Sequence, residues 1–180
     1  AISGDGSNEI YIFDYNLNKI KTIHNNNEPW GLKYNKNGDK LIVGMGSPPP
    51  SINIYDANNN YNKVSSFKKH SNFTMGVGFL DSHTAVSAGG DNFEINIWNI
   101  NTNKVITKIE SVANRIWSVG ISGNKIAWGN QWSDTNGKGK LEKFINIVNF
   151  KIQKIVQKDQ FKKMSSLNGY YTLIKKNRKK

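Results

Sequence analysis

The chain has 180 residues, contains no Cys and carries a formal net charge of +12. Without Cys it can form no disulfide, no Cys-ligated zinc site and no thiol nucleophile. No apolar run approaches the about 18 residues of a membrane-spanning helix, and no signal peptide is visible. We therefore expect a cytoplasmic protein that does not enter a membrane.

The positive charge is concentrated at one end. Residues 151–180 hold 10 Lys or Arg and one acid, a net +9, whereas residues 1–150 hold 15 and 12, a net +3. A protein that binds nucleic acid through a cationic face would carry an excess of Lys and Arg in the rest of the chain as well. The basic stretch has three interpretations: a solvated edge or tail, a site for an acidic protein partner, or a contact with nucleic acid or a membrane surface.

Short strands separated by turns are predicted along the whole chain. Residues 1–4 form the end of a strand, and 10–13 and 19–23 form a hairpin. Three units of four strands follow, and a fifth unit begins near 164. The strands of the three units are predicted at 29–34, 41–44, 52–55 and 64–67, at 74–79, 84–87, 94–98 and 104–109, and at 116–121, 125–128, 144–148 and 151–156.

The third strand of each unit is the clearest repeat. Apolar and polar residues alternate in Glu94-Ile95-Asn96-Ile97-Trp98, and the same shape recurs three more times, ending at Phe13, Tyr55 and Val148. These anchor positions are 42, 43 and 50 residues apart. A period of about 40–45 residues with several strands per unit is typical of propeller blades.

The sequence therefore predicts an all-β, incomplete β-propeller of about four four-stranded antiparallel blades. The expected divisions are 1–23 (end of a blade), 24–67, 68–109, 110–156 with an insertion at 130–140, and 157–180 (start of a further blade with the basic end). An open ring exposes the edges of its first and last blades. We expect that the chain is part of a longer polypeptide, that it is incompletely resolved, or that a second copy or a partner completes the ring.

The units resemble WD repeats. The Trp-Asp pair of that family is matched by Phe13-Asp14, Tyr55-Asp56, Trp98-Asn99 and Val148-Asn149, and its His by His24 and His70. In WD repeats a Trp, a Ser or Thr, an Asp and a His of one blade form a hydrogen-bonded network. The resemblance implies such a structural network from His70, Ser87, Asp91 and Trp98.

A narrower resemblance covers residues 110–150. The run Arg115-Ile116-Trp117-Ser118-Val119-Gly120, followed by Lys125-Ile126-Ala127-Trp128-Gly129-Asn130, is similar to the WD-repeat regions of bacterial proteins that also carry a caspase-like peptidase domain. It implies a peptidase elsewhere in the parent polypeptide, because no peptidase motif occurs in these 180 residues.

No motif for catalysis, a cofactor or a metal is present. The chain lacks a Gly-x-Ser-x-Gly elbow, and its three His are spread over residues 24, 70 and 83. We expect no enzymatic activity, no cofactor, no metal and no small-molecule substrate.

The remaining class of function is binding to a partner, and aromatic residues indicate a candidate binding surface. Trp and Arg are enriched in binding hot spots. Arg115, Trp117, Trp128 and Trp132 form the candidate partner-binding face; in the alternative, these Trp pack between blades. We favour a non-catalytic scaffold for protein–protein interaction that is a sensing or regulatory region of a larger protein, of the peptidase-linked bacterial kind. The alternative function is a nucleic-acid-associated propeller that uses the basic end.

Overall fold

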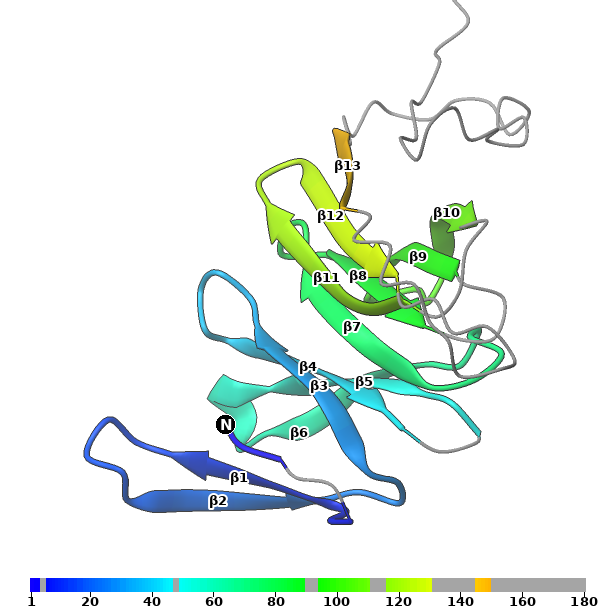
Figure 1. Ribbon diagram of the computed structural model, residues 1–180. Helices are drawn as coiled ribbons and strands as arrows, with labels where there is room; N and C mark the ends of the chain where they lie inside the picture. The colour runs from blue at the N-terminus through cyan, green and yellow to red at the C-terminus, as the bar shows by residue number, and fades with distance from the viewer. Residues whose placement is uncertain (4–5, 47–48, 90–93, 111–115, 131–144, 150–180) are drawn as a thin grey trace, which may run out of the picture.

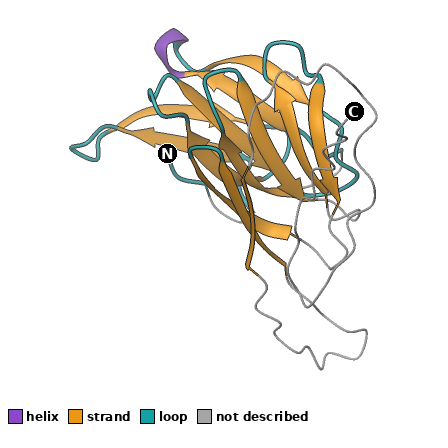
Figure 2. Cartoon of the chain, turned by 90° about the horizontal axis from the view of Figure 1, so that it is seen from above, coloured by secondary structure: helices purple, strands orange, loops and turns teal. Residues whose placement is uncertain are grey.

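The computed structural model describes residues 1–3, 6–46, 49–89, 94–110, 116–130 and 145–149. This part of the chain is built almost wholly from β-strands (Figure 2). Its one helical element is the short 3-10 turn η1 (Ala57–Asn59). No helix in the described ranges is long and apolar enough to cross a membrane. The predicted all-β class is confirmed.

The strands form four antiparallel sheets in which spatial order follows chain order. The first sheet pairs β1 (Glu9–Phe13) with β2 (Lys19–His24). The second contains β3 (Pro29–Tyr34), β4 (Lys40–Met45), β5 (Ile52–Asp56) and β6 (Asn62–Phe67). The third contains β7 (Thr74–Phe79), β8 (Thr84–Gly89), β9 (Glu94–Asn99) and β10 (Val105–Glu110). The fourth contains β11 (Ile116–Ser122), β12 (Lys125–Asn130) and β13 (Ile145–Asn149).

The sheets follow one another in space as they do in sequence (Figure 1). The innermost strands of the last three sheets lie side by side, with β7 between β3 and β11. The first sheet is extended by a bridge between Ile2 and Tyr11, which places the start of the chain beside β1. These meandering sheets form an incomplete β-propeller, as predicted.

A separate hydrophobic cluster fills each space between neighbouring sheets. The first two sheets enclose Ile10, Ile12, Ile23, Leu41, Val43, Met45 and Tyr55. The second and third enclose Ile42, Ile52, Ile54, Phe67, Val77, Ala85, Trp98 and Ile100. The third and fourth enclose Val86, Ala88, Ile95, Ile97, Ile109, Ile116, Ile126 and Trp128. Each blade is therefore stabilised by its neighbours rather than by a core of its own.

The turn after the third strand of a blade is fixed by one polar side chain. The Oδ1 atoms of Asp14, Asp56 and Asn99 accept hydrogen bonds from the backbone N–H two residues further on, at 2.9, 3.0 and 3.0 Å. These are the positions of the second letter of the Trp-Asp pair. Asp and Asn both supply the acceptor oxygen that the turn needs, so either residue serves there.

The predicted insertion at 130–140 lies outside the described residues except for residue 130. Residues 157–180, with the predicted further blade and the basic end, also lie outside them. The divisions of the chain at 23, 67, 109 and 156 stay predictions.

Candidate functional site

Each innermost strand carries a β-bulge near its start. Trp30 has no partner between the pairs Pro29–Met45 and Gly31–Gly44. Met75 takes the same place in β7, between Thr74 and Gly76. Trp117 takes it in β11, between Ile116 and Ser118. A bulge redirects the side chain of the extra residue, so the three strands present one large apolar side chain each at equivalent positions.

These three residues, here called the inner row, are accessible to solvent. Trp30 is 39% exposed and Trp117 is 44% exposed, and Met75 between them is half-buried. Because β3, β7 and β11 are neighbours, the inner row runs across three blades. Exposed indole rings at equivalent places on a rigid framework are typical of a surface that binds a partner.

Glycine residues bring the innermost strands close together beside the inner row. A Cβ on Gly31 would lie 2.2 Å from the backbone oxygen of Met75, and one on Gly76 would lie 2.9 Å from the backbone nitrogen of Val119. Each glycine directly follows the bulged residue of its strand. The backbones that carry the inner row are therefore in contact, which fixes the spacing of its members.

Trp30 is held in one orientation by three neighbours. Its ring stacks on Phe73 of the next blade, with centroids 5.4 Å apart and planes 8° apart. Its Nε1–H donates to Glu28 Oε2 at 3.0 Å. Gly46 lies against the indole, since a Cβ there would come within 2.4 Å of Nε1. A ring that is already ordered loses little side-chain entropy when it binds.

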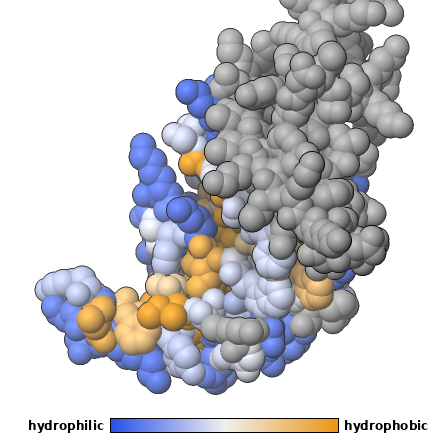
Figure 3. All heavy atoms as spheres, in the orientation of Figure 1, coloured by the Kyte–Doolittle hydropathy of each residue, from blue (hydrophilic) through white to orange (hydrophobic). Residues whose placement is uncertain are grey.

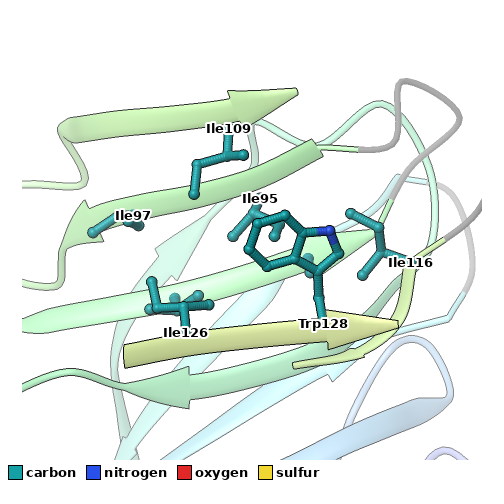
Figure 4. Packing of buried hydrophobic residues seen from close by; sticks show 8 residues of the cluster. Ile95, Ile97, Ile109, Ile116, Ile126 and Trp128 are labelled. Carbon is teal, nitrogen blue, oxygen red and sulfur yellow. The ribbon is translucent and has the colours of Figure 1, made fainter. Parts of the chain in front are cut away.

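The predicted partner-binding face does not form as a unit. Trp117 is on the surface, but Trp128 is only 3% exposed and packs with Ile95, Ile109 and Ile116 between the third and fourth sheets (Figure 4). The assignment of Trp128 to a contact surface is corrected: on β12 its side chain shares the inward face with Ile126, two residues earlier. Arg115 and Trp132 lie outside the described residues.

The third blade brings together three of the four residues of the predicted structural network. Ser87 Oγ lies 2.8 Å from His70 Nε2 and accepts a hydrogen bond from Trp98 Nε1 at 3.1 Å. The fourth residue, Asp91, lies outside the described residues. The carboxylate that the structure places on the imidazole belongs to Glu94, with Oε1 3.1 Å from His70 Nδ1.

Glu94 is also paired with a lysine at the edge of the blade. Lys108 Nζ lies 2.7 Å from Glu94 Oε2, and the carboxylate itself is buried. Burial raises the pKa of Glu94, but His70 and Lys108 lower it by more, and the pKa falls from 4.5 to about 2. The buried carboxylate is therefore ionised near neutral pH and joins the outer strand to the network.

Sequence reasoning missed Glu94, Asn96 and Phe67. Asn96 Nδ2 lies 3.3 Å from His70 Nε2. The Phe67 ring stacks on Trp98 with centroids 4.4 Å apart and meets His70 edge-on. The alternation of β9 held the signal for two of the three, because residues 94, 96 and 98 share one face of the strand. The side chains of this cluster contact one another in the interior of the blade, and we interpret the cluster as a structural unit.

The second blade forms equivalent buried hydrogen bonds with other residues. Tyr55 occupies the position of Trp98, and its hydroxyl donates to Asn25 Oδ1 at 2.5 Å and accepts from Asn53 Nδ2 at 3.4 Å. Asn53 is two residues before Tyr55, as Asn96 is before Trp98. The repeat therefore conserves a geometry rather than a set of side chains.

The described ranges offer no group of three or more His, Cys, Asp or Glu that could hold a metal ion. Two comparisons relate the chain to known proteins. The family model described as eukaryotic translation initiation factor eIF2A matches residues 1–125. The chain belongs to the eIF2A family. This is a family of WD40-like β-propellers, and such families are typically non-catalytic.

The solved structure of U3-55K, a WD40 propeller, is similar to this eIF2A-family chain at a TM-score of 0.62 and 15% sequence identity. The similarity covers 69% of this chain and 40% of that one, so the chain spans less than half of that propeller. At this identity the similarity concerns the fold alone. A search of curated proteins found no match.

Proposed function

We propose that this eIF2A-family chain is a non-catalytic scaffold that binds protein through the inner row. One observation carries the proposal: three adjacent blades present Trp30, Met75 and Trp117 at the same bulge, and both indoles are exposed. Trp98 and Trp128 are buried in the cores, so among the Trp residues that the structure describes only the two at bulges are exposed. Large aromatic side chains supply much of the binding energy of protein interfaces.

The name of the family supports a translation-related role, which we include in the proposal together with a cytoplasmic location. We also propose that it is a regulatory region of a larger protein. The similarity to a solved propeller supports the larger size alone, because it covers 40% of that propeller's length. The comparisons give no support to the peptidase-linked bacterial setting that the narrower resemblance implied.

Cosedimentation with purified small ribosomal subunits tests the proposal. The full chain is compared with the double variant Trp30→Ala, Trp117→Ala. The matched control, Tyr15→Ala with Leu17→Ala, removes two apolar side chains that are 92% and 80% exposed in the β1–β2 turn. We expect the inner-row variant to bind at least about tenfold more weakly, the effect of roughly one hot-spot contact, and the control to bind normally.

Equal binding by the chain and the inner-row variant would contradict the proposal. The salt dependence separates it from the alternative, because contacts between lysine and phosphate weaken steeply as salt rises and apolar contacts do not. Binding that falls with salt and is lost on removal of residues 175–180 would favour the nucleic-acid interpretation of the basic end. That interpretation stays a prediction, because residues 150–180 lie outside the described part of the chain.

A further inference from the structure

The outer strands carry a second set of equivalent bulges. Ile20 has no partner between the pairs Lys19–Phe13 and Lys21–Ile12. Val64 takes this place in β6, and Ile106 takes it in β10. In each blade the bulge lies opposite the recurring anchor residue, which is Phe13, Tyr55 or Trp98. The register therefore repeats an unpaired aliphatic residue on three successive outer strands.

All three residues are exposed: Ile20 by 60%, Val64 by 53% and Ile106 by 40%. A bulge on an edge strand protects it from pairing with other strands. That protection comes from the backbone and needs no aliphatic side chain, and lysine is the residue that edges commonly use for it. The fold therefore does not account for Ile, Val and Ile at these places.

Hydrogen bonds between blades connect the three bulges into one surface. Lys21 Nζ donates to Asn60 Oδ1 at 3.1 Å, and Ser65 Oγ donates to Asn103 Oδ1 at 2.8 Å. Asn60 and Asn103 have left-handed backbone angles (φ 50° and 54°) at equivalent turns of the second and third blades. Residues 19–21, 60–65 and 103–106, here called the outer strip, thus follow one another around the circumference.

The outer strip is basic as well as aliphatic. It contains Lys19, Lys21, Lys63 and Lys104 and no Asp or Glu. The carboxylates in the turns that precede β2 and β6 accept hydrogen bonds within their own turns: Asp14 from Asn16 and Asn18, and Asp56 from Asn58. In Figure 3 the β1–β2 hairpin at the lower left carries hydrophobic residues, in orange, beside hydrophilic residues, in blue.

We propose that the outer strip binds an acidic protein segment whose aliphatic side chains pack on Ile20, Val64 and Ile106. Its carboxylates would pair with the lysines. Single-stranded nucleic acid fits less well, because it is held by stacking on aromatic rings. The strip's one aromatic residue, Tyr61, packs against the core between the first two sheets, and its hydroxyl lies 2.8 Å from that of Tyr34. This proposal is independent of the inner row.

Fluorescence anisotropy with a labelled peptide tests the proposal. The probe is a peptide of about 12 residues that alternates Glu with Leu, long enough to cross several strands. A Glu–Ser peptide, a Lys–Leu peptide and an oligouridylate of the same length are the comparisons. The aliphatic variant is Ile20→Ser, Val64→Ser, Ile106→Ser, and the charge variant is Lys19→Glu, Lys63→Glu, Lys104→Glu.

Two controls match these variants. Lys33→Glu, Lys36→Glu, Lys125→Glu makes the same change of charge at exposed lysines away from the strip. Trp30→Ser with Trp117→Ser alters the inner row instead. We expect the Glu–Leu peptide to bind best, the aliphatic and charge variants each to weaken it at least about tenfold, and both controls to stay within about twofold. The single variant Val64→Ser repeats the test with little effect on folding, because Val64 is half-exposed.

Several results would overturn the proposal. These are no binding of the Glu–Leu peptide, equal binding of the Glu–Ser peptide, or equal losses in the charge variant and its lysine control. Tighter binding of the oligouridylate, lost in the charge variant alone, would assign the outer strip to nucleic acid. Loss of peptide binding in the Trp30 and Trp117 control would assign the peptide to the inner row and leave the outer strip without a role.

Discussion

His70 and Glu94 meet in the interior of the third blade, with Nδ1 and Oε1 3.1 Å apart and side chains only 1% and 2% exposed. The two residues come from different elements, since His70 precedes β7 and Glu94 begins β9. A buried charge that loses its partner is costly. The blade should therefore be sensitive both to substitution at this pair and to pH.

The pH dependence follows from the lowered pKa of Glu94. The pKa is about 2 in the folded chain and 4.5 ordinarily, so the unfolded state binds the proton more tightly. The ionised Glu94 carboxylate then contributes stability above about pH 5, of order 3 kcal/mol at most, and this contribution is lost as the pH falls toward 2. We expect Glu94→Gln to lower the urea midpoint at neutral pH and to match the parent chain near pH 2.

Urea unfolding followed by circular dichroism across this pH range is the measurement. Glu28→Gln removes the same charge at the surface, where Glu28 accepts a hydrogen bond from Trp30, and should lower the urea midpoint at neutral pH by less. A constant difference between the Glu94 variant and the parent from pH 7 to pH 2.5 would show that ionisation of Glu94 contributes nothing.

Ser87 joins His70 to Trp98 and should be energetically coupled to both. Ser87→Ala leaves the buried Trp98 Nε1 without its acceptor, and Trp98→Phe removes that donor while it keeps an aromatic ring against Phe67. Each change should destabilise the chain by about 1–3 kcal/mol. In a double-mutant cycle the two losses should overlap by about 1 kcal/mol. Additive losses would argue against the hydrogen bond.

The contact between innermost strands predicts a difference between two glycines. Gly31→Ala places a methyl group 2.2 Å from the Met75 backbone oxygen, and should cost about 2 kcal/mol or more because backbone must move. Gly120→Ala is the control, since its nearest neighbour would be Ala127 O at 4.0 Å. Thermal unfolding should rank Gly31→Ala well below Gly120→Ala, and equal melting temperatures would contradict the close approach.

Leu17 is under backbone strain. Its φ of 65° lies in the left-handed region, and the side chain is 80% exposed, so it gains little from burial. Asn103 and Asn60 have similar φ in the corresponding turns. We expect Leu17→Asn to stabilise the chain by about 1 kcal/mol, because Asn tolerates this conformation better. Asn103→Leu should do the reverse and also remove the bond to Ser65; a loss of stability in Leu17→Asn would refute the account of strain.

The sequence predicted the fold well because alternation and a period of about 43 residues survive variation in single side chains. The sequence could not predict the bulges, because the extra residue of a bulge is of the same residue types as the rest of the strand. Trp117 and Trp128 show the consequence: both were expected on one face, yet Trp117 is the bulged residue and Trp128 is paired with Val119 in the ladder. The role of Glu94 could not be predicted from the resemblance to WD repeats, because that resemblance implies Asp91 as the acidic member of the network, whereas Glu94 contacts His70.

Hydroxyl-radical footprinting of the chain with and without small ribosomal subunits tests the central claim most directly, because Trp and Met side chains react readily and mass spectrometry assigns each site. The inner row predicts that Trp30, Met75 and Trp117 are protected together on binding, while Tyr15 in the β1–β2 turn keeps its reactivity. Protection that leaves Trp30 and Trp117 as reactive as in the free chain would contradict the claim that the inner row is the binding surface.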